Sequence, residues 1–186
     1  MAVNSELARI WGSDNNSISL APVGSTLPTD LTTALDAAFE DVGWIHSDGV
    51  TEALTGSAEK IRGWQGNGVV RTRMNEPGTT VSFTALETKA QTQALRYHEK
   101  SFSTTAGVRT ATRGAGQRIS ARAAVIDLFD SDDDEVRMRL VIPRLEITPN
   151  GDLVYANSDI AGYPFIGEII GDYTALSTDL EAAVTP

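Results

Sequence analysis

The histidines and carboxylates are the residues of this chain whose types could perform acid–base or nucleophilic chemistry. His46 and His98 stand where no serine, cysteine or carboxylate follows the order of a catalytic triad, so we interpret both as partly buried structural residues. The chain has no cysteine, which excludes disulfides, thiolate metal sites and cysteine nucleophiles. Acid pairs that cleave glycosides are defined by their spacing in the fold. An acid-based hydrolase with a deep cleft is therefore one alternative.

Two short motifs resemble ligand-binding loops but each lacks a required residue. The acidic run 130–135 has carboxylates at alternate positions, as calcium loops do, yet it lacks the loop glycine, and Val141 stands where the bidentate glutamate belongs. We interpret this run as a solvated hairpin tip. Gly66 and Gly68 begin like a dinucleotide fingerprint, but Arg71 occupies the next required glycine position and no helix follows. A hairpin turn explains these glycines better, so the sequence predicts no metal and no cofactor.

The net charge of -10 is unevenly distributed along the 186 residues. Residues 130–181 hold twelve acids and three bases, whereas the rest of the chain holds thirteen acids and twelve bases. A protein that grips nucleic acid by its phosphates needs a basic face, so this balance argues against DNA binding. No apolar run reaches the length of a membrane-spanning helix. We expect no membrane binding, and synthesis and folding in the cytoplasm.

Turn residues divide most of the chain into strands. Asp48-Gly49, Asn67-Gly68, Pro77-Gly78 and Asn150-Gly151 each separate segments that favour strands, and Asn-Gly is the preferred pair for a tight hairpin turn. We expect strands at 8–22, 42–46, 58–65, 69–74, 79–87, 118–129, 136–148 and 160–170. Alternation is clearest where one face holds Val136, Met138, Leu140 and Ile142 and the other holds Arg137 and Arg139, which is typical of a sheet with one face in a core. The sequence predicts a mainly β, antiparallel fold.

Helix signals are fewer. Thr88 and Gln91 have the spacing of a capping box and predict a helix over 88–99. Apolar residues at helical spacing predict a second, shorter helix over 30–40. Residues 100–117 have almost nothing to bury and are predicted to be a long loop, while 174–186 could form a C-terminal arm.

The three tryptophans lie within expected strands. Trp11, Trp44 and Trp64 are interpreted as core residues or as links between neighbouring strands. A subunit interface is the alternative, because tryptophan is enriched there too.

Several blocks of the sequence resemble, in order, the major tail tube proteins of long-tailed bacteriophages, in particular those of phages that infect actinobacteria. The blocks are APVGSTLPT at 21–29, TALDAAFEDVGWIHSDGV at 33–50, IRGWQG at 61–66, VSFTALET at 81–88, VIPRLEITPNGDLVYAN at 141–157, and Gly162-Tyr163. They are distributed over residues 21–163, which is most of the chain. The departures are 100–117 and the acidic run 130–135, so no residue role is carried over there.

The resemblance implies a fold and a function. The fold is like that of the type VI secretion tube subunit: two packed antiparallel sheets, as a sandwich or barrel, flanked by one helix, with 1–186 as a single tail-tube domain. The function is that of a structural virion protein, not an enzyme. Its rings, usually hexameric, stack into a hollow tube through which DNA passes without specific binding. Implied partners are other copies of the chain and tail proteins such as the tape measure and the terminator, with assembly in the host cytoplasm.

Charged residues at the two departures are candidates for ring-to-ring contacts. Arg109 and Arg113 of the predicted loop are expected to meet acids of an adjacent ring, such as Asp132, Asp133 and Asp134. A β-sandwich that decorates the virion, or binds a receptor or carbohydrate, is the other alternative; it would show a concave aromatic patch and a stable monomer or small oligomer.

Overall fold

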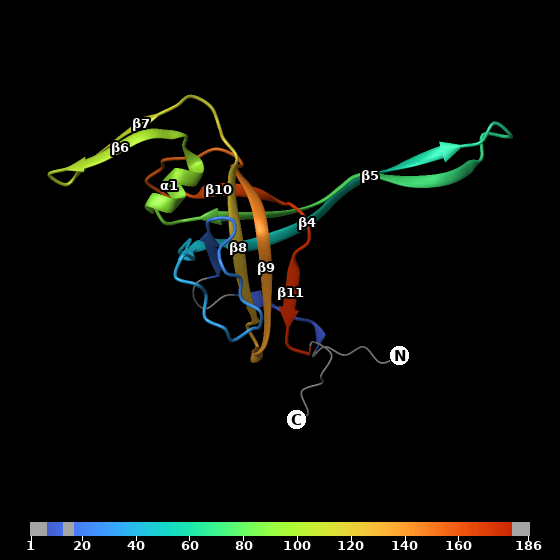
Figure 1. Ribbon diagram of the computed structural model, residues 1–186, viewed down its shortest axis with the longest axis horizontal. Coiled ribbons are helices and arrows are strands. Elements are labelled where there is room, and N and C mark those ends of the chain that lie inside the picture. The colour runs from blue at the N-terminus through green and yellow to red at the C-terminus, as the bar shows by residue number, and fades with distance from the viewer. Residues whose placement is uncertain (1–6, 13–16, 180–186) are drawn as a thin grey trace.

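The computed structural model describes residues 7–12 and 17–179, apart from the side chain of Asp134. Its elements, shown in Figure 1, are β1 (Trp11–Gly12), β2 (Ile18–Ala21), β3 (Glu40–Asp41), β4 (Ile45–Arg62), β5 (Val69–Ala85), α1 (Ala90–Arg96), β6 (Glu99–Thr105), β7 (Val108–Arg113), β8 (Ser120–Asp130), β9 (Asp133–Pro149), β10 (Tyr163–Ile169) and β11 (Thr174–Ser177).

The strands form two antiparallel sheets, which confirms the predicted mainly β class. The larger sheet has nine strands in the order β3-β2-β8-β9-β10-β5-β4, with β1 added to β8 and β11 added to β9. It ends at β3 and β4 and does not close into a barrel. The second sheet contains only β6 and β7, and Figure 1 shows this hairpin projecting from the body. The expectation of two antiparallel sheets with one helix is confirmed, while the barrel alternative does not form.

Strand β9 is shared by both halves of that sheet: the half with β1, β2, β3, β8 and β11, and the half with β4, β5 and β10. One edge of β9 pairs with β8 along most of its length, while the other edge pairs first with β11 and then with β10. Between these partners the register shifts: Ala124 pairs with Ile142 and Arg122 pairs with Leu145, so Pro143 and Arg144 face a single residue of β8. Such a β-bulge bends a strand. In Figure 1, β4, β5 and β10 accordingly run across β8 and β9.

The core fills the space between the two halves. One cluster joins Ile18, Leu20 and Ile126 from one half to Val81, Phe83 and Phe165 from the other, and Leu140, Ile142, Leu145 and Ile147 of β9 belong to both sides of the bulge. The apolar positions of β9 change parity at the bulge, which keeps all four side chains on the core side. The predicted burial of Leu140 and Ile142 is confirmed.

The predicted helix over 88–99 is shorter, and the predicted capping box does not form. α1 covers Ala90–Arg96, its N-cap residue is Lys89, and no side chain caps it. The Thr88 hydroxyl instead lies 3.0 Å from the hydroxyl of Tyr163. Leu95 is fully buried in the core cluster, so tertiary packing holds the helix.

The predicted helix over 30–40 is wrong. The Asp30 carboxylate accepts hydrogen bonds from the backbone N–H groups of Thr32 and Thr33, and an aspartate that binds the following backbone in this way favours a turn over a helix. Leu31, Leu35 and Phe39 are half-buried. Their spacing therefore identified the protein-facing side of the segment but not its backbone conformation.

Most of the segment predicted as a loop, 100–117, also forms strands. β6 and β7 pair from Glu99↔Arg113 to Thr105↔Val108 around Ala106 and Gly107, both of which have positive φ, as a tight hairpin turn requires. Of the predicted turns, Asn67 does lie between β4 and β5, but Gly49 and Gly78 lie inside these strands. The strands are longer than predicted because irregularities in their pairing, not chain reversals, occur there.

Candidate assembly surfaces

The longest projection of the molecule is the outer part of the β4–β5 hairpin, residues 55–77, which we call the long arm (Figure 1). Trp64 at its tip is 98% exposed, and Ile61, Val69, Val70 and Met74 are exposed along it. Exposed apolar residues are ordinary when scattered, but a contiguous set of them marks an interaction surface. The long arm therefore offers apolar contacts that the described chain does not satisfy.

The arm is also basic within an acidic chain. It carries Lys60, Arg62, Arg71 and Arg73 against two glutamates. Arg62 donates a hydrogen bond to the Asn67 carbonyl oxygen at 3.0 Å. Among the described residues, no ion pair forms to the other three bases. Their charge is available to another molecule.

A second projection is the β6–β7 hairpin, residues 99–113, which we call the short arm. Phe102 and Val108 are exposed on it. Arg109 pairs with Glu99, with Nη2 and Oε2 2.6 Å apart, and its guanidinium lies 5.2 Å from the Phe102 ring centre. The hydrogen bond from Arg109 holds the pKa of Glu99 below its usual range. These contacts connect the two strands of the hairpin, since Glu99 and Phe102 belong to β6 and Arg109 to β7.

The sequence-predicted interface residues lie at opposite ends of the subunit. Arg113 at the base of the short arm donates to Gln93 Oε1 at 2.8 Å and lies 3.5 Å over the Tyr97 ring. Asp132 and Asp133 lie at the β8–β9 turn, at the far end of β8 from the short arm. The structure thus does not bring the arginines and these acids together within one chain. Contact between them across two subunits stays a prediction.

The β8–β9 turn is organised by Asp130, which is buried. Its carboxylate accepts hydrogen bonds from the Asp132 N–H at 3.2 Å and from Arg9 at 3.1 Å, and these two partners hold its pKa below the usual range. The buried acid of the run is therefore structural, whereas Asp132 is exposed. The side chain of Asp134 lies outside the described residues.

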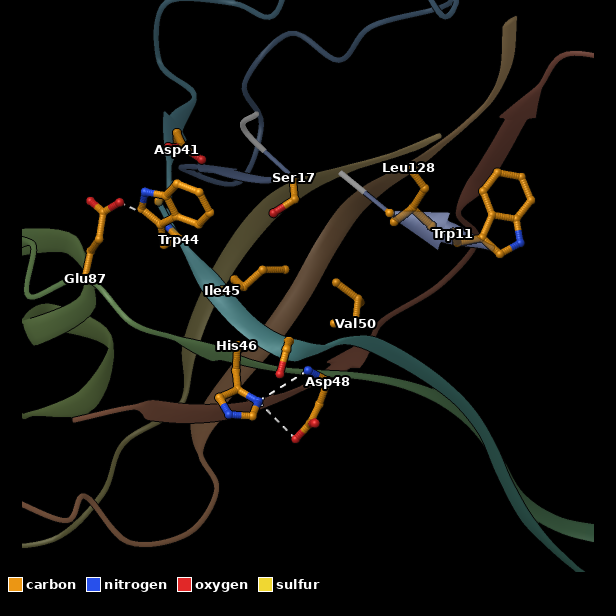
Figure 2. A pocket seen from close by; sticks show the side chains of 14 residues that line it. Trp11, Ser17, Asp41, Trp44, Ile45, His46, Asp48, Val50, Glu87 and Leu128 are labelled. Atoms are coloured by element: carbon orange, nitrogen blue, oxygen red, sulfur yellow. Dashed lines mark hydrogen bonds and ion pairs between the residues drawn. The ribbon is translucent and has the colours of Figure 1, made fainter. Parts of the chain in front are cut away.

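A pocket of about 530 Å³ lies where β4 leaves the body (Figure 2). Trp44 and Trp11 stand at its two sides, and Ile45, Val50 and Leu128 line the space between them. The backbone N–H of Trp44 donates to Glu87 Oε1 at 2.9 Å. Gly43, with φ of +91°, allows this approach, because a side chain there would overlap the Glu87 carboxylate.

Carboxylates surround this pocket. Lys89 bridges Glu87 at 3.3 Å and Asp41 at 3.4 Å. The hydrogen bonds from Trp44 and Lys89 lower the pKa of Glu87. Burial acts to lower the pKa of Lys89, but its bonds and charge interactions with the two carboxylates outweigh burial and raise that pKa. Asp48, fully solvated on the rim, adds a third acid, so the pocket mouth is negative.

His46 pairs with Asp48 across 3.1 Å on the same rim. Among the described residues, no serine hydroxyl hydrogen-bonds to His46. Nor do three or more histidine or carboxylate side chains of residues 7–12 and 17–179 gather as a metal site would require. The helix of the described chain is too short and polar to cross a membrane.

The three tryptophans are not core residues, which corrects the first interpretation of them. Trp11, Trp44 and Trp64 are 36%, 76% and 98% exposed. Two of them line the pocket and the third is the tip of the long arm. Large exposed indoles are costly unless another surface covers them, so the alternative of a subunit interface stays a prediction.

Comparison with known protein families identifies the family of the chain. The family model for phage tail tube proteins matches residues 1–176 of the chain. The chain belongs to the phage tail tube proteins. A search of curated protein sequences found no significant match. Membership makes the chain a structural component of the virion tail that assembles with itself and with other tail proteins. The narrower kinship with actinobacteriophages stays a prediction, because the family description names no host.

Two features of this tail tube protein, its arms and its pocket, were not predicted from the sequence. The arms were predicted to be a loop and a series of short strands, since neither arm has a face to bury. In VRTATR at 108–113, the β-branched residues Val108, Thr110 and Thr112 occupy alternate positions beside an Ala-Gly turn, which favours a hairpin. The pocket has no sequence signal, because β1, β4 and β8 contribute to it from distant parts of the chain.

Proposed function

We propose that this tail tube protein self-assembles into hexameric rings that stack into a hollow tube, and that phage DNA leaves the capsid through that tube. The observation that best supports this proposal is the pair of projecting arms. A subunit with unsatisfied apolar side chains on two arms is suited to contacts with several neighbours. A monomeric decoration or receptor-binding module has no use for them.

The outer edge of β4 supports the closure of a ring. Among the described residues, no strand pairs with this side of the 18-residue strand. An unpaired edge is a template for strand addition. Pairing with a neighbouring subunit would continue the sheet around the ring and satisfy these backbone groups.

The charge distribution supports a conduit that does not hold DNA. The two arms contain seven of the 15 bases and three of the 25 acids, so the rest of the chain has 22 acids against eight bases. If the arms are used between subunits, the acidic body remains to line the tube. Such a wall repels phosphates over a screening length of about 8 Å at physiological salt.

Electron microscopy of the concentrated, purified protein tests the proposal. Hollow filaments of uniform diameter with six-fold symmetry in cross-section are expected. Isolated particles at every concentration, also after addition of the tape measure and terminator proteins, would contradict it.

A further inference from the structure

We propose that Trp64 at the tip of the long arm inserts into the pocket between Trp11 and Trp44 of a second copy of this chain. The inference rests on the proposed self-assembly and names the contact that joins successive copies. It commits to one donor residue and one receiving site.

The donor is exposed in a way that the single chain does not explain. Trp64 is 98% exposed and lies in the turn Gly63–Gly68, which is closed by the hydrogen bond from the Gly63 N–H to the Gly68 carbonyl oxygen at 2.8 Å. Asn67, with φ of 54°, completes a defined turn. The indole is therefore presented on a built tip, and aromatic residues on such tips are typical anchors of protein interfaces.

The receiving pocket is large enough to admit an indole and has suitable chemistry. Its volume of about 530 Å³ lies within the range of small-molecule sites, and an indole is smaller than most ligands of such sites. Ile45, Val50 and Leu128 provide apolar walls, and Trp44 provides an exposed ring against which another aromatic ring can pack (Figure 2).

Charge complementarity selects this pocket. The arm behind Trp64 carries Lys60, Arg62, Arg71 and Arg73. The pocket lining contains the carboxylates of Asp41, Asp48 and Glu87; Lys89 pairs with two of them, so three acids still exceed one base and Asp48 is the acid that Lys89 leaves open. A second pocket, between Leu54 and Tyr173, has no charged residue in its lining, so it offers no such complementarity. Opposite charges on the two surfaces would steer the arm and fix its register.

The contact must be between different copies, because donor and pocket lie at opposite ends of one strand. Val50 lines the pocket and Arg62 ends β4 at the tip. These twelve residues of extended chain span about 40 Å, so the tip lies far from its own pocket. Figure 1 shows the long arm extending away from the body of the subunit. A head-to-tail contact of this kind leaves a free tip and a free pocket at every step, so it propagates. The pockets of two joined copies should then be no more than about 40 Å apart.

Disulfide trapping tests the contact directly, since the chain has no cysteine. One chain carries Gln65→Cys beside the retained Trp64, and a second carries Ser47→Cys on the exposed pocket rim. The two chains are mixed, allowed to assemble and then oxidised. A disulfide between the two cysteines should join them into cross-linked dimers. The matched control replaces Ser47→Cys with Ser101→Cys on the short arm, which should not cross-link to Gln65→Cys.

Exchange of charges between the two surfaces provides a second, independent test. Arg71→Glu and Asp48→Arg should each raise the concentration needed for assembly by at least about tenfold, and the double variant should recover most of the loss. Microscopy of the same samples separates the outcomes. Two results would overturn this contact alone. One is tubes in which Gln65→Cys and Ser47→Cys do not cross-link, and the other is a double variant that needs as high a concentration for assembly as the single variants. Failure of the unmodified chain to assemble would overturn the proposed function together with it.

Discussion

Arg139 and Asp127 face each other across β9 and β8, with Nε 2.6 Å from Oδ1 and Nη2 3.2 Å from Oδ2. The remaining nitrogen of the guanidinium, Nη1, donates to the carbonyl oxygens of Asp30 and Thr33, each at 3.0 Å. One buried arginine thus fastens the segment 22–39 to the outer face of the sheet. Sequence alternation had placed Arg139 on the solvent side, and the structure shows that this side is covered.

Loss of Arg139 should destabilise the subunit. Arg139→Met keeps the aliphatic stem but removes the bidentate pair and leaves two carbonyl oxygens without their donor, which should lower the free energy of unfolding by about 2–4 kcal/mol. Urea denaturation measures the change. The control is Arg144→Met, which breaks an exposed pair with Glu146 and should cost under about 1 kcal/mol. Equal effects would show that the loop is held by other contacts.

Gly167 should not tolerate a methyl group. A Cβ at this position of β10 would lie 2.6–3.0 Å from the side-chain carbons of Leu145 in the core. Gly167→Ala should therefore lower stability by about 1–3 kcal/mol through overpacking. Gly68→Ala at the long arm is the control, since nothing lies within 4 Å of the added Cβ and its φ is not positive. Thermal unfolding measures the stability of both variants. If Gly167→Ala unfolds at the same temperature as the unmodified protein, Leu145 can move aside and the prediction is wrong.

Stability should fall on acidification partly through Asp30. Hydrogen bonds from the Thr33 hydroxyl and from the N–H groups of Thr33 and Thr32 hold the pKa of its carboxylate well below the ordinary 3.8. Because the folded-state pKa is depressed, this contribution is complete above the unfolded value and is lost as pH falls below about 4. The stability difference between wild type and Asp30→Asn, measured by denaturation, should shrink between pH 6 and pH 3. Asp152→Asn, in an exposed loop, serves as the control.

The short arm should change most on assembly. A two-stranded hairpin without a packed face is marginally stable in water, so its amides should exchange quickly in the isolated subunit. Contacts in a stacked tube should slow them. Hydrogen exchange followed for 99–113 in subunits and in tubes gives the comparison, with the buried strand β8 as an internal reference. The same exchange rates in both forms would exclude this arm from assembly.

Assembled tubes should not retain duplex DNA. The acidic excess outside the arms repels phosphates, and the repulsion grows as salt is lowered. Co-sedimentation of DNA with tubes is expected to stay at background both at low salt, about 20 mM, and at physiological salt, about 150 mM. Binding that strengthens at low salt would instead reveal a basic inner wall.

The sequence predicted what depends on burial and missed what depends on partners. Leu140 and Ile142 alternate with arginines, and the structure buries them as predicted. The first interpretation of Trp64, a core residue or a link between strands, follows the usual burial of an indole in a single chain, with a subunit interface as the alternative. The structure exposes Trp64 almost completely, which agrees with the proposed contact to another copy.

Local competition explains the other errors. The apolar spacing in 30–40 indicated a helix, but the Asp30 side chain binds the backbone of the next turn. The bulge at Pro143 and Arg144 and the pocket between Trp11 and Trp44 arise from strands that meet only after folding. No spacing within the sequence records such meetings.

Strand β5 connects the long arm mechanically to the centre of the fold. It begins at Val69 near the arm tip and ends at Ala85 in the core, where it is bonded on one side to β4 and on the other to β10. Tension along the arm would load these rows of hydrogen bonds in shear, so they would share the force instead of opening one after another. A pull at Trp64 is therefore resisted by the whole sheet, and a joint made at the arm tip can carry load between subunits.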